Sequence, residues 1–251
     1  MDLLEAALIL LAGAAAGTIN AAVGSGSLIT FPTLLAFGIP PVTANVSNNI
    51  GLVPGGLAGV WGYRRELADQ RRRLLVLGSM SVLGGIVGAV LLLVLPAAAF
   101  RSVVPVLIGV AVVLVAVQPW LARRLAHRQA GHADIGPGAM VATAAVGVYG
   151  GYFGGAQGIL LVGALGTLMT ESLQRLNALK NGLTTAVNTV AAVTFLVVAP
   201  SQVDWRVVAL IAVGSSAGGL IGSRIGRRLP QPALRAIIVV VGLVAIANLL
   251  R

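Results

Sequence analysis

The chain has no cysteine and few charged residues. The absence of cysteine from 251 residues excludes disulfides, thiolate nucleophiles and thiolate-ligated metal or iron–sulfur sites. Charged residues make up 10% of the sequence, whereas a soluble globular domain carries about 25%. Apolar residues make up 57%, and the mean hydropathy is +0.97. This composition indicates an integral membrane protein.

Histidine and acidic residues are nearly absent from the apolar parts of the sequence. Both histidines, His127 and His132, lie in a polar stretch, so a histidine-based metal or acid–base site within the membrane is not expected. Six of the seven acidic residues lie at the N-terminus or in expected loops: Asp2, Glu5, Glu66, Asp69, Asp134 and Asp204. The seventh, Glu171, ends a short apolar segment, so a sodium or proton site built on a buried carboxylate has little support. We expect no metal and no cofactor.

The net charge of +10 comes mainly from arginines. They form short clusters beside apolar segments, without the basic stripe and interleaved aromatic residues of a nucleic-acid-binding surface. The expected partners are therefore the lipid bilayer and a small anionic substrate, with no nucleic acid and with a homodimer left open. The positive-inside rule places the clusters at residues 64–73, 123–128 and 224–228 in the cytoplasm, and both termini are then expected outside the inner membrane.

Ten apolar segments cover most of the chain. They lie at residues 3–23, 27–39, 42–62, 74–95, 101–122, 138–154, 158–171, 177–199, 205–223 and 233–250. A helix needs about 20 apolar residues to cross the hydrocarbon core, and the second and seventh segments are too short. Each of these two follows a glycine-rich break, at residues 24–27 and 154–158. Such breaks predict broken or re-entrant helices within an all-α membrane protein.

The two halves of the chain resemble each other at an offset of about 130 to 134 residues. The glycine-rich breaks correspond, residues 45–49 correspond to 177–181, and the pair Gly84/Gly88 corresponds to Gly218/Gly222. These glycine pairs are expected to serve close helix packing rather than chemistry.

Each half has five segments and an odd number of true membrane crossings. The second half therefore starts on the opposite side of the membrane and is inverted relative to the first. We therefore predict two inverted repeats, at residues 1–122 and 138–251, joined within one membrane domain by a cytoplasmic linker at 123–137. This architecture is common among secondary transporters, whose sites lie at the repeat interface and use discontinuous helices.

Lys180 is the only lysine, and it lies at the head of an apolar segment. On a helix that starts near Asn177, residues 177, 180, 181, 184 and 188 share one polar face. A lysine at the centre of a membrane helix costs about 2.5–3.5 kcal/mol, so this side chain either snorkels to the interface or serves a site. The neighbouring amides and hydroxyls, without a carboxylate in the segment, favour a small oxyanion. In the other half, Asn48 takes the place of Lys180, so the charge of the anion is expected on the half that contains the lysine.

Several stretches of sequence match motifs of a known family. They are residues 20–32, 40–45 and 52–59 in the first half and 150–160 and 177–181 in the second. Together they resemble the sulfite exporter TauE/SafE family of membrane permeases. The resemblance covers nearly the whole chain and implies transport of sulfite or of organic sulfur anions such as sulfonates.

The chain departs from the family pattern at three positions. Ser25 and Ser27 interrupt the first glycine run. Gln157 occupies a position where the family usually has a glycine or a small apolar residue. These differences concern substrate choice rather than fold.

These features predict a secondary transporter or permease, not an enzyme, that works by rocking one inverted half against the other. An anion channel of the same fold remains open. An intramembrane hydrolase using Ser27 or Ser47 with Lys180 has less support, because no histidine or buried carboxylate accompanies them. The expected substrate-binding residues are Asn20, Gly24, Ser25, Gly26, Ser27, Asn45, Asn48, Asn49, Gly155, Gln157, Gly158, Asn177, Lys180 and Asn181. The identity of the anion, the direction of transport and the coupling ion are left open.

Overall fold

The structure is a computed structural model that describes residues 1–126, 135–225 and 231–249, and these residues form only helices and connecting segments. The long helices are α1 (Leu3–Ala22), α3 (Pro41–Gly62), α5 (Arg71–Val94), α6 (Ala97–Ala126), α7 (Pro137–Tyr152), α9 (Leu173–Val198), α10 (Trp205–Ile225) and α11 (Gln231–Leu249). The shorter ones are α2 (Ser27–Ala36), α4 (Arg64–Leu67), α8 (Gln157–Leu168) and the 3₁₀ turns η1 (Ala68–Gln70) and η2 (Pro200–Gln202).

Each expected apolar segment corresponds to one helix, and the two short segments are the short helices α2 and α8. Five of the described helices are long and apolar enough to cross a membrane. The all-α membrane fold is therefore confirmed. Helix α6 continues to Ala126, so the start of the expected linker is helical, while His127 and His132 lie outside the described residues.

Prolines, a serine and a glycine set several helix ends. Pro41 and Pro137 occupy the first turns of α3 and α7, where a missing N–H removes no intrahelical bond. The Ser172 side chain caps α9 by accepting from the Arg175 N–H. Helix α1 ends at the first break, where Gly24 adopts φ +92°, a conformation that favours glycine.

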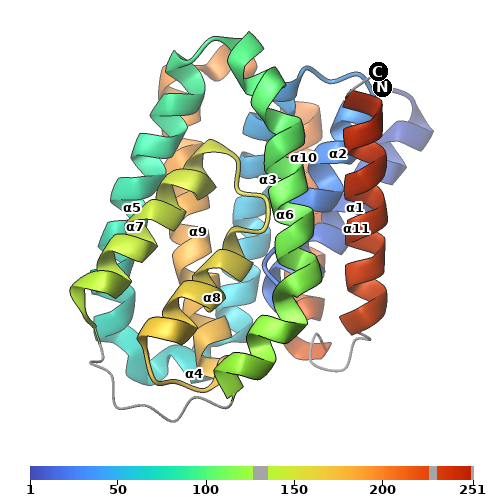
Figure 1. The fold of residues 1–251 in the computed structure, drawn as a ribbon. Coiled ribbons are helices and arrows are strands. Elements are labelled where there is room, and N and C mark those ends of the chain that lie inside the picture. The colour runs from blue at the N-terminus through green and yellow to red at the C-terminus, as the bar shows by residue number, and fades with distance from the viewer. Residues whose placement is uncertain (127–134, 226–230, 250–251) are drawn as a thin grey trace.

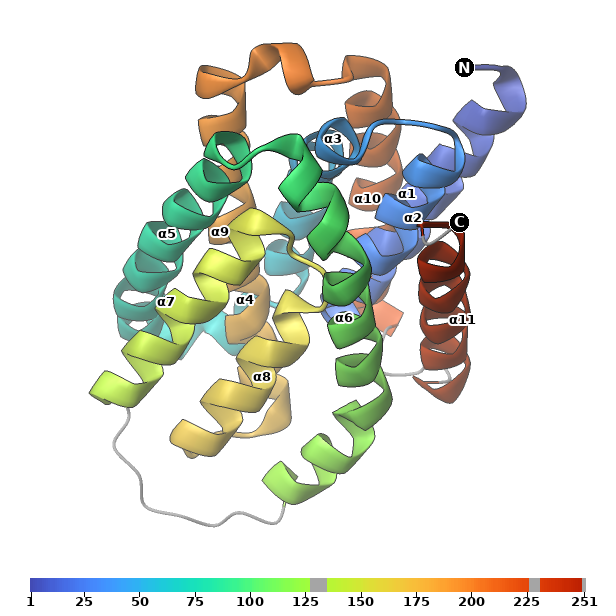
Figure 2. The same ribbon diagram turned by 45° about the horizontal axis from the view of Figure 1, so that its top comes forward.

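The helices form two bundles, and each bundle contains helices from both halves of the sequence. One bundle contains α1, α2, α3, α10 and α11, and the other contains α5, α6, α7, α8 and α9 (Figure 1; Figure 2). The packing of α1 on α10 has a counterpart in α7 on α5, and α1 on α2 has a counterpart in α7 on α8. Contacts of α3 with α9 and of α6 with α11 join the bundles. Neither bundle coincides with one half of the sequence.

Glycines make the closest helix crossings possible. A Cβ on Gly84 in α5 would lie 2.1 Å from a carbonyl oxygen of α7, and one on Gly88 would lie 2.0 Å from another. On α10, a Cβ on Gly218 would lie 2.0 Å from a carbonyl oxygen of α1, and one on Gly222 would lie 2.4 Å from one. The expected packing role of both glycine pairs is confirmed, and each pair joins helices from different sequence halves.

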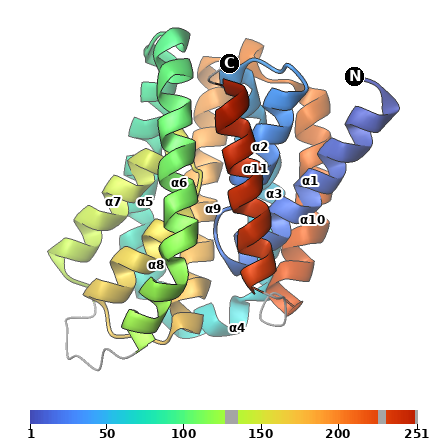
Figure 3. The same ribbon diagram turned by 45° about the vertical axis from the view of Figure 1, so that its right-hand side comes forward.

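The start of α1 and the end of α11 lie at the same face of the molecule (Figure 3). Helix α4, the arginines at the start of α5 and the end of α10 lie at the opposite face (Figure 1). Large apolar side chains such as Leu75, Val113, Val197 and Val213 are exposed on the outside of the bundles. An apolar outer surface of this kind fits a lipid environment.

Candidate functional site

The two glycine-rich breaks contact each other between the bundles. The Gly158 N–H donates to the Gly24 carbonyl oxygen at 3.0 Å. A Cβ on Gly24 would lie 2.6 Å from the Gly158 Cα, and a Cβ on Gly158 would lie 2.5 Å from the Gly24 Cα. Any side chain at either position would therefore push the breaks apart. Figure 1 shows the short helices α2 and α8, which follow these breaks.

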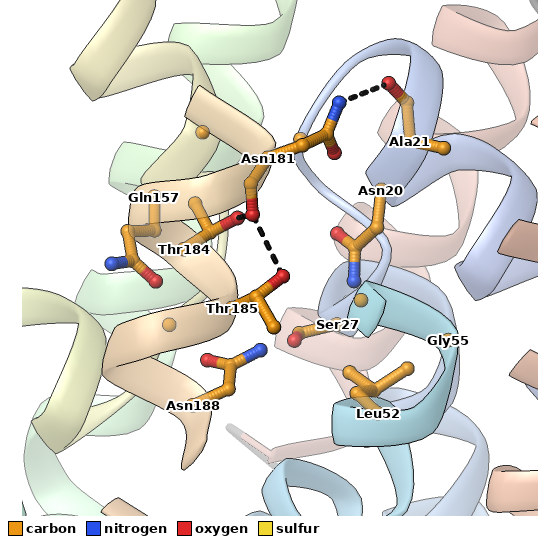
Figure 4. A pocket seen from close by; sticks show the side chains of 14 residues that line it. Asn20, Ala21, Ser27, Leu52, Gly55, Gln157, Asn181, Thr184, Thr185 and Asn188 are labelled. Carbon is orange, nitrogen blue, oxygen red and sulfur yellow. Dashed lines mark hydrogen bonds between the residues drawn. The ribbon is translucent and has the colours of Figure 1, made fainter. Parts of the chain in front are cut away.

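A small polar cavity adjoins this crossing (Figure 4). It is lined by Asn20, Ala21, Gly24, Ser27, Leu52, Gly55, Gly56, Gly154, Gln157, Gly158, Asn181, Thr184, Thr185 and Asn188. The cavity leaves about 20 Å³ for the centres of water molecules, and about 10–15 Å³ is needed to hold one water. In this conformation it is thus closed around little more than one water. Its lining contains amides and hydroxyls but no charged side chain.

Three amides at the cavity have N–H groups without a protein partner among the described residues. The Asn20 Oδ1 accepts from the Gly26 N–H at 2.6 Å, which leaves Nδ2 directed toward the cavity (Figure 4). The Asn188 Oδ1 accepts from Asn49 at 3.5 Å, and its Nδ2 points toward Ser27. The Gln157 side chain is buried, and its Nε2 has no hydrogen-bond partner. The Asn20 and Asn188 N–H groups can donate to an acceptor in the cavity, whereas the Gln157 amide packs against Gly150 of α7 and its Nε2 points away from Asn20 in this conformation (Figure 4).

The hydroxyls of Thr184 and Thr185 are engaged within α9 itself. They donate to the Lys180 and Asn181 carbonyl oxygens at 2.9 and 2.7 Å. In these rotamers both threonines present only acceptor oxygen to the cavity.

Two helices begin at the cavity. Ser27 is the first residue of α2 and Gln157 the first of α8, and no side chain caps either start. The N-terminus of a helix carries a partial positive charge. The first N–H groups of α8 already donate to the Gly154, Gly24 and Ala156 carbonyl oxygens, so these helix starts act through their charge. Together with the Asn20 and Asn188 N–H groups, the positive ends of these helices make the cavity suited to an anion.

Lys180 is fully buried, but its ammonium group does not line the cavity. The Nζ donates to the carbonyl oxygens of Asn20 at 2.7 Å and Ala21 at 3.3 Å, at the C-terminal end of α1. Its stem packs behind the crossing, since a Cβ on Gly158 would lie 2.7 Å from the Lys180 Cδ. The side chain does not snorkel in this conformation. When protonated, Lys180 offsets the partial negative charge of the α1 end, directly behind the cavity wall.

Asparagines from both sequence halves cap the ends of α1 and α7. Asn177 and Asn181 donate to the Ala21 carbonyl oxygen at 3.3 and 3.1 Å. In the other half, Asn45 donates to the Tyr152 carbonyl oxygen at 2.9 Å. The α1 end therefore holds two amides and an ammonium, whereas the corresponding α7 carbonyl receives one amide.

Comparison with known proteins fits this geometry. The model of the family described as Sulfite exporter TauE/SafE matches residues 9–249. The chain belongs to this family. It is 29% identical over 240 residues to the "Probable membrane transporter protein YfcA" of Escherichia coli K12, covering 94% of this chain and 86% of that one. It is 25% identical over 249 residues to a "Probable membrane transporter protein" of Haemophilus influenzae, covering 99% and 95%. No solved structure matches.

Some of the expected site residues line the cavity, and others lie behind its wall. The residues that line it are Asn20, Gly24, Ser27, Gln157, Gly158 and Asn181. Asn45, Asn177 and Lys180 hold helix ends instead. The remaining expected residues are outside the lining: Ser25, Gly26, Asn48, Asn49 and Gly155. Of these, Asn48 accepts a hydrogen bond from Thr30 of α2, and Gly26 positions the Asn20 side chain.

Sequence reasoning omitted several residues of the cavity lining. They are Ala21, Leu52, Gly55, Gly56, Gly154, Thr184, Thr185 and Asn188. Thr184 and Asn188 lie on the polar face that helical spacing identifies, and Gly154 belongs to the second break. The only sequence feature that indicates Gly55 and Gly56 is the TauE/SafE motif at residues 52–59.

Glu171 lies away from the cavity, between α8 and α9, in an ion cluster. Its carboxylate bonds Arg73 at 2.5 Å and Arg175 at 2.9 Å. The buried Gln70 donates to the Arg175 carbonyl oxygen at 3.1 Å. Burial by itself raises the pKa of Glu171, but the hydrogen bond and charge of Arg73 and the charge of Arg175 outweigh it and lower the pKa. In this conformation Glu171 ties α5 to α9.

Replacing Glu171 by glutamine is expected to destabilise the protein by about 1–2 kcal/mol, between the values for exposed and buried pairs. Because the folded-state pKa lies below the ordinary 4.5, the ion cluster stabilises at neutral pH and this contribution is lost as pH falls below that value. Thermal unfolding at pH 7 and pH 3.5 measures the effect. The gap between wild type and Glu171→Gln should shrink at pH 3.5, and an equal gap at both values would contradict this account.

A larger cavity of about 570 Å³ opens at the face that holds the chain ends. Its walls come from the starts of α3 and α6, the end of α5 and η2. Arg101 is the only charged residue of its lining. Thr43 of α3 donates to Gln202 of η2 at 3.1 Å. A cavity therefore opens at this face beside the neutral contact of Thr43 with Gln202, and the Glu171 ion cluster lies at the opposite face.

Proposed function

We propose that this TauE/SafE protein is a secondary transporter or permease that moves a small sulfur-containing anion, sulfite or a sulfonate, across the inner membrane. The observation that carries the proposal is the polar lining of the cavity where α2 and α8 begin, with N–H groups of Asn20 and Asn188 that have no partner among the described residues and with the buried Gln157, whose Nε2 has none either. A buried donor left without a partner costs about 1–3 kcal/mol, which a bound oxyanion would offset. The family name specifies sulfite, and the relatives are named for membrane transport.

Lys180 supports the proposal by its charge rather than by contact. Left uncompensated, the carbonyl end of α1 would repel an anion in the adjoining cavity. The ammonium on the Asn20 and Ala21 carbonyl oxygens removes this repulsion. The positive ends of α2 and α8 then dominate the field in the cavity.

The proposed mechanism is alternating access between two inverted repeats. Matched helix contacts in the two bundles support it, and so do matched contacts of the 3₁₀ turns. Gln70 of η1 bonds the third residue of α9, Arg175, and Gln202 of η2 bonds the third residue of α3, Thr43. Because each bundle mixes both sequence halves, the rocking units that we propose are the bundles. The present conformation would then be closed at the Glu171 face.

The orientation follows from the arginines and can be tested directly, because the chain has no native cysteine. We propose that the face holding the chain ends is external. A membrane-impermeant thiol reagent added to intact cells should label Ser201→Cys, at the wide cavity, and should label Asp69→Cys only after permeabilisation. The reverse pattern would invert the proposed topology.

Uptake of radiolabelled sulfite and methanesulfonate into proteoliposomes tests the transport function. Saturable uptake and counterflow, in which internal unlabelled anion drives entry of label, are the expected results. Flux that rises linearly with concentration and shows no counterflow would favour a channel. Uptake equal to that of protein-free liposomes would contradict the proposal.

The geometry does not favour a Ser/Lys hydrolase. The Lys180 Nζ donates to backbone carbonyls, and the Ser47 hydroxyl accepts from the Asp204 N–H at 2.9 Å. In the described residues, neither Ser27 nor Ser47 bonds the lysine.

A further inference from the structure

We infer that the coupling ion of this transporter is a proton carried by Lys180, which enters and leaves the protein together with the anion. The inference rests on the proposed transport function and specifies its energetics. Lys180 acts here as the proton-binding residue, and the cavity amides act as the anion-binding residues.

The Lys180 Nζ lies at the C-terminal end of α1. In transporters built from inverted repeats, carbonyls at the C-terminal ends of broken helices commonly coordinate the coupling Na⁺ or H⁺. Here the carbonyl oxygens of Asn20 and Ala21, at the end of α1 and just before the first break, are bonded by the Lys180 Nζ. A side-chain cation thus occupies the place of a free coupling cation.

Lys180 has no counter-charge beside it in the residues that the structure describes. In that part of the chain, the Lys180 Nζ forms no ion pair and bonds the carbonyl oxygens of Asn20 and Ala21. The tyrosines of the helices packed on α9 are Tyr63, Tyr149 and Tyr152, of which the first bonds Asn177. The described charged residues of the packed elements belong to helix ends or to the short helices: Glu5, Arg64, Arg65, Glu66, Asp69, Arg71, Arg72, Arg73, Arg101, Arg123 and Arg175. Of these, Arg73 and Arg175 pair with Glu171, and Arg175 also pairs with Asp69.

Lys180 and the adjoining cavity together form a buried centre. This centre is electrically neutral in two states. In one, the cavity holds a monoanion and Lys180 is an ammonium. In the other, the cavity is empty and Lys180 is a neutral amine. The two mixed states leave a net charge buried in a low-dielectric interior, which costs several kcal/mol. Movement of the bundles through the neutral states transfers one proton with each monoanion.

Lys180 also connects the two bundles through hydrogen bonds. Lys180 belongs to α9 of one bundle, and its acceptors belong to α1 of the other. Hydrogen bonds from an ionised donor are about twice as strong as neutral ones. When the bundles separate and water enters, the proton passes from Nζ to water and leaves an amine that holds α1 more weakly. Proton release and anion release therefore accompany the same opening.

Proteoliposomes that contain a pH-sensitive dye test the inference. Methanesulfonate is the probe, because a sulfonate remains ionised and carries no proton of its own. We expect one proton to enter with each methanesulfonate and the uptake rate to be unchanged when a potassium gradient with valinomycin sets a membrane potential. Uptake without acidification, or uptake that follows the potential, would overturn the inference but not the transport function. Absence of any anion flux would overturn both.

Variants separate a proton carrier from a structural cap. Lys180→Arg keeps a permanent charge, so it should retain anion counterflow but lose net uptake at least tenfold. Asn177→Ala removes a neutral donor from the same Ala21 oxygen and should leave the ratio of one proton per anion unchanged. Proton-coupled net uptake by Lys180→Arg would overturn the inference. If gel filtration shows that Lys180→Arg does not fold, the number of protons that enter with each methanesulfonate through the wild-type protein decides the question.

Discussion

Gln157→Leu is expected to weaken anion transport strongly without destabilising the protein. A hydrogen bond to a charged group contributes about 1.5–3 kcal/mol, so losing the Nε2 donor should raise the KM for the anion by about 10- to 150-fold. The Nε2 atom of this buried amide has no hydrogen-bond partner in the protein. Its replacement by an apolar group of similar size should therefore leave the thermal unfolding midpoint unchanged or higher. Proteoliposome kinetics and thermal unfolding measure the two effects.

Gln118→Leu is the matched control for this variant. Gln118 lies on α6, outside the cavity lining, and its Oε1 is likewise buried without a partner. Its replacement should affect stability in the same direction but leave the KM unchanged. Equal effects of both variants on KM, or a large loss of stability in Gln157→Leu, would show that Gln157 is structural.

Gly158→Ala is expected to reduce transport more than tenfold and to destabilise the protein. The added Cβ would lie 2.5 Å from the Gly24 Cα, and overpacking of this kind costs about 1–3 kcal/mol. Because the breaks form the cavity wall, their separation also displaces the starts of α2 and α8. Thermal unfolding and methanesulfonate uptake provide the measurements.

Gly78→Ala tests whether the effect is specific to the crossing. Gly78 lies within α5, and a Cβ there would meet no atom within 4 Å. Alanine at an open helical position should leave transport intact and stabilise the helix by up to about 1 kcal/mol. Normal uptake by Gly158→Ala would mean that the contact between the breaks is not needed for transport.

The sequence predicts the helices and the breaks well because both are local properties. Hydropathy identifies all ten apolar segments, and glycine runs identify the starts of α2 and α8. The close packing of Gly84 and Gly218 follows from small residues at helical spacing. The short elements α4, η1 and η2 are missed, because a few residues carry no hydropathy signal.

The exchange of helices between the bundles could not be predicted from these patterns. It depends on which apolar faces meet, and the faces of α5 and α10 are similar in sequence. The environment of Lys180 was also missed. Helical spacing places it on the polar face of α9, but its four-carbon stem reaches past the Gly24–Gly158 crossing to the end of α1. Only the three-dimensional arrangement of α1 and α9 determines that the ammonium caps carbonyls.

The asymmetry between Lys180 and Asn48 remains a prediction about where the anion lies. Both residues stand at corresponding places in the duplicated motif, yet Lys180 is next to the cavity wall and Asn48 bonds Thr30 of α2. The account therefore places the anion at the crossing, with the charge of Lys180 behind it.

A crystal structure with selenite, a sulfite analogue whose selenium scatters anomalously, tests this placement most directly. The account predicts one anomalous peak in the cavity, within hydrogen-bonding distance of Gln157 and Asn20. A peak centred nearer Asn48 than Lys180, or no peak in the cavity at a selenite concentration that blocks sulfite uptake, would contradict it.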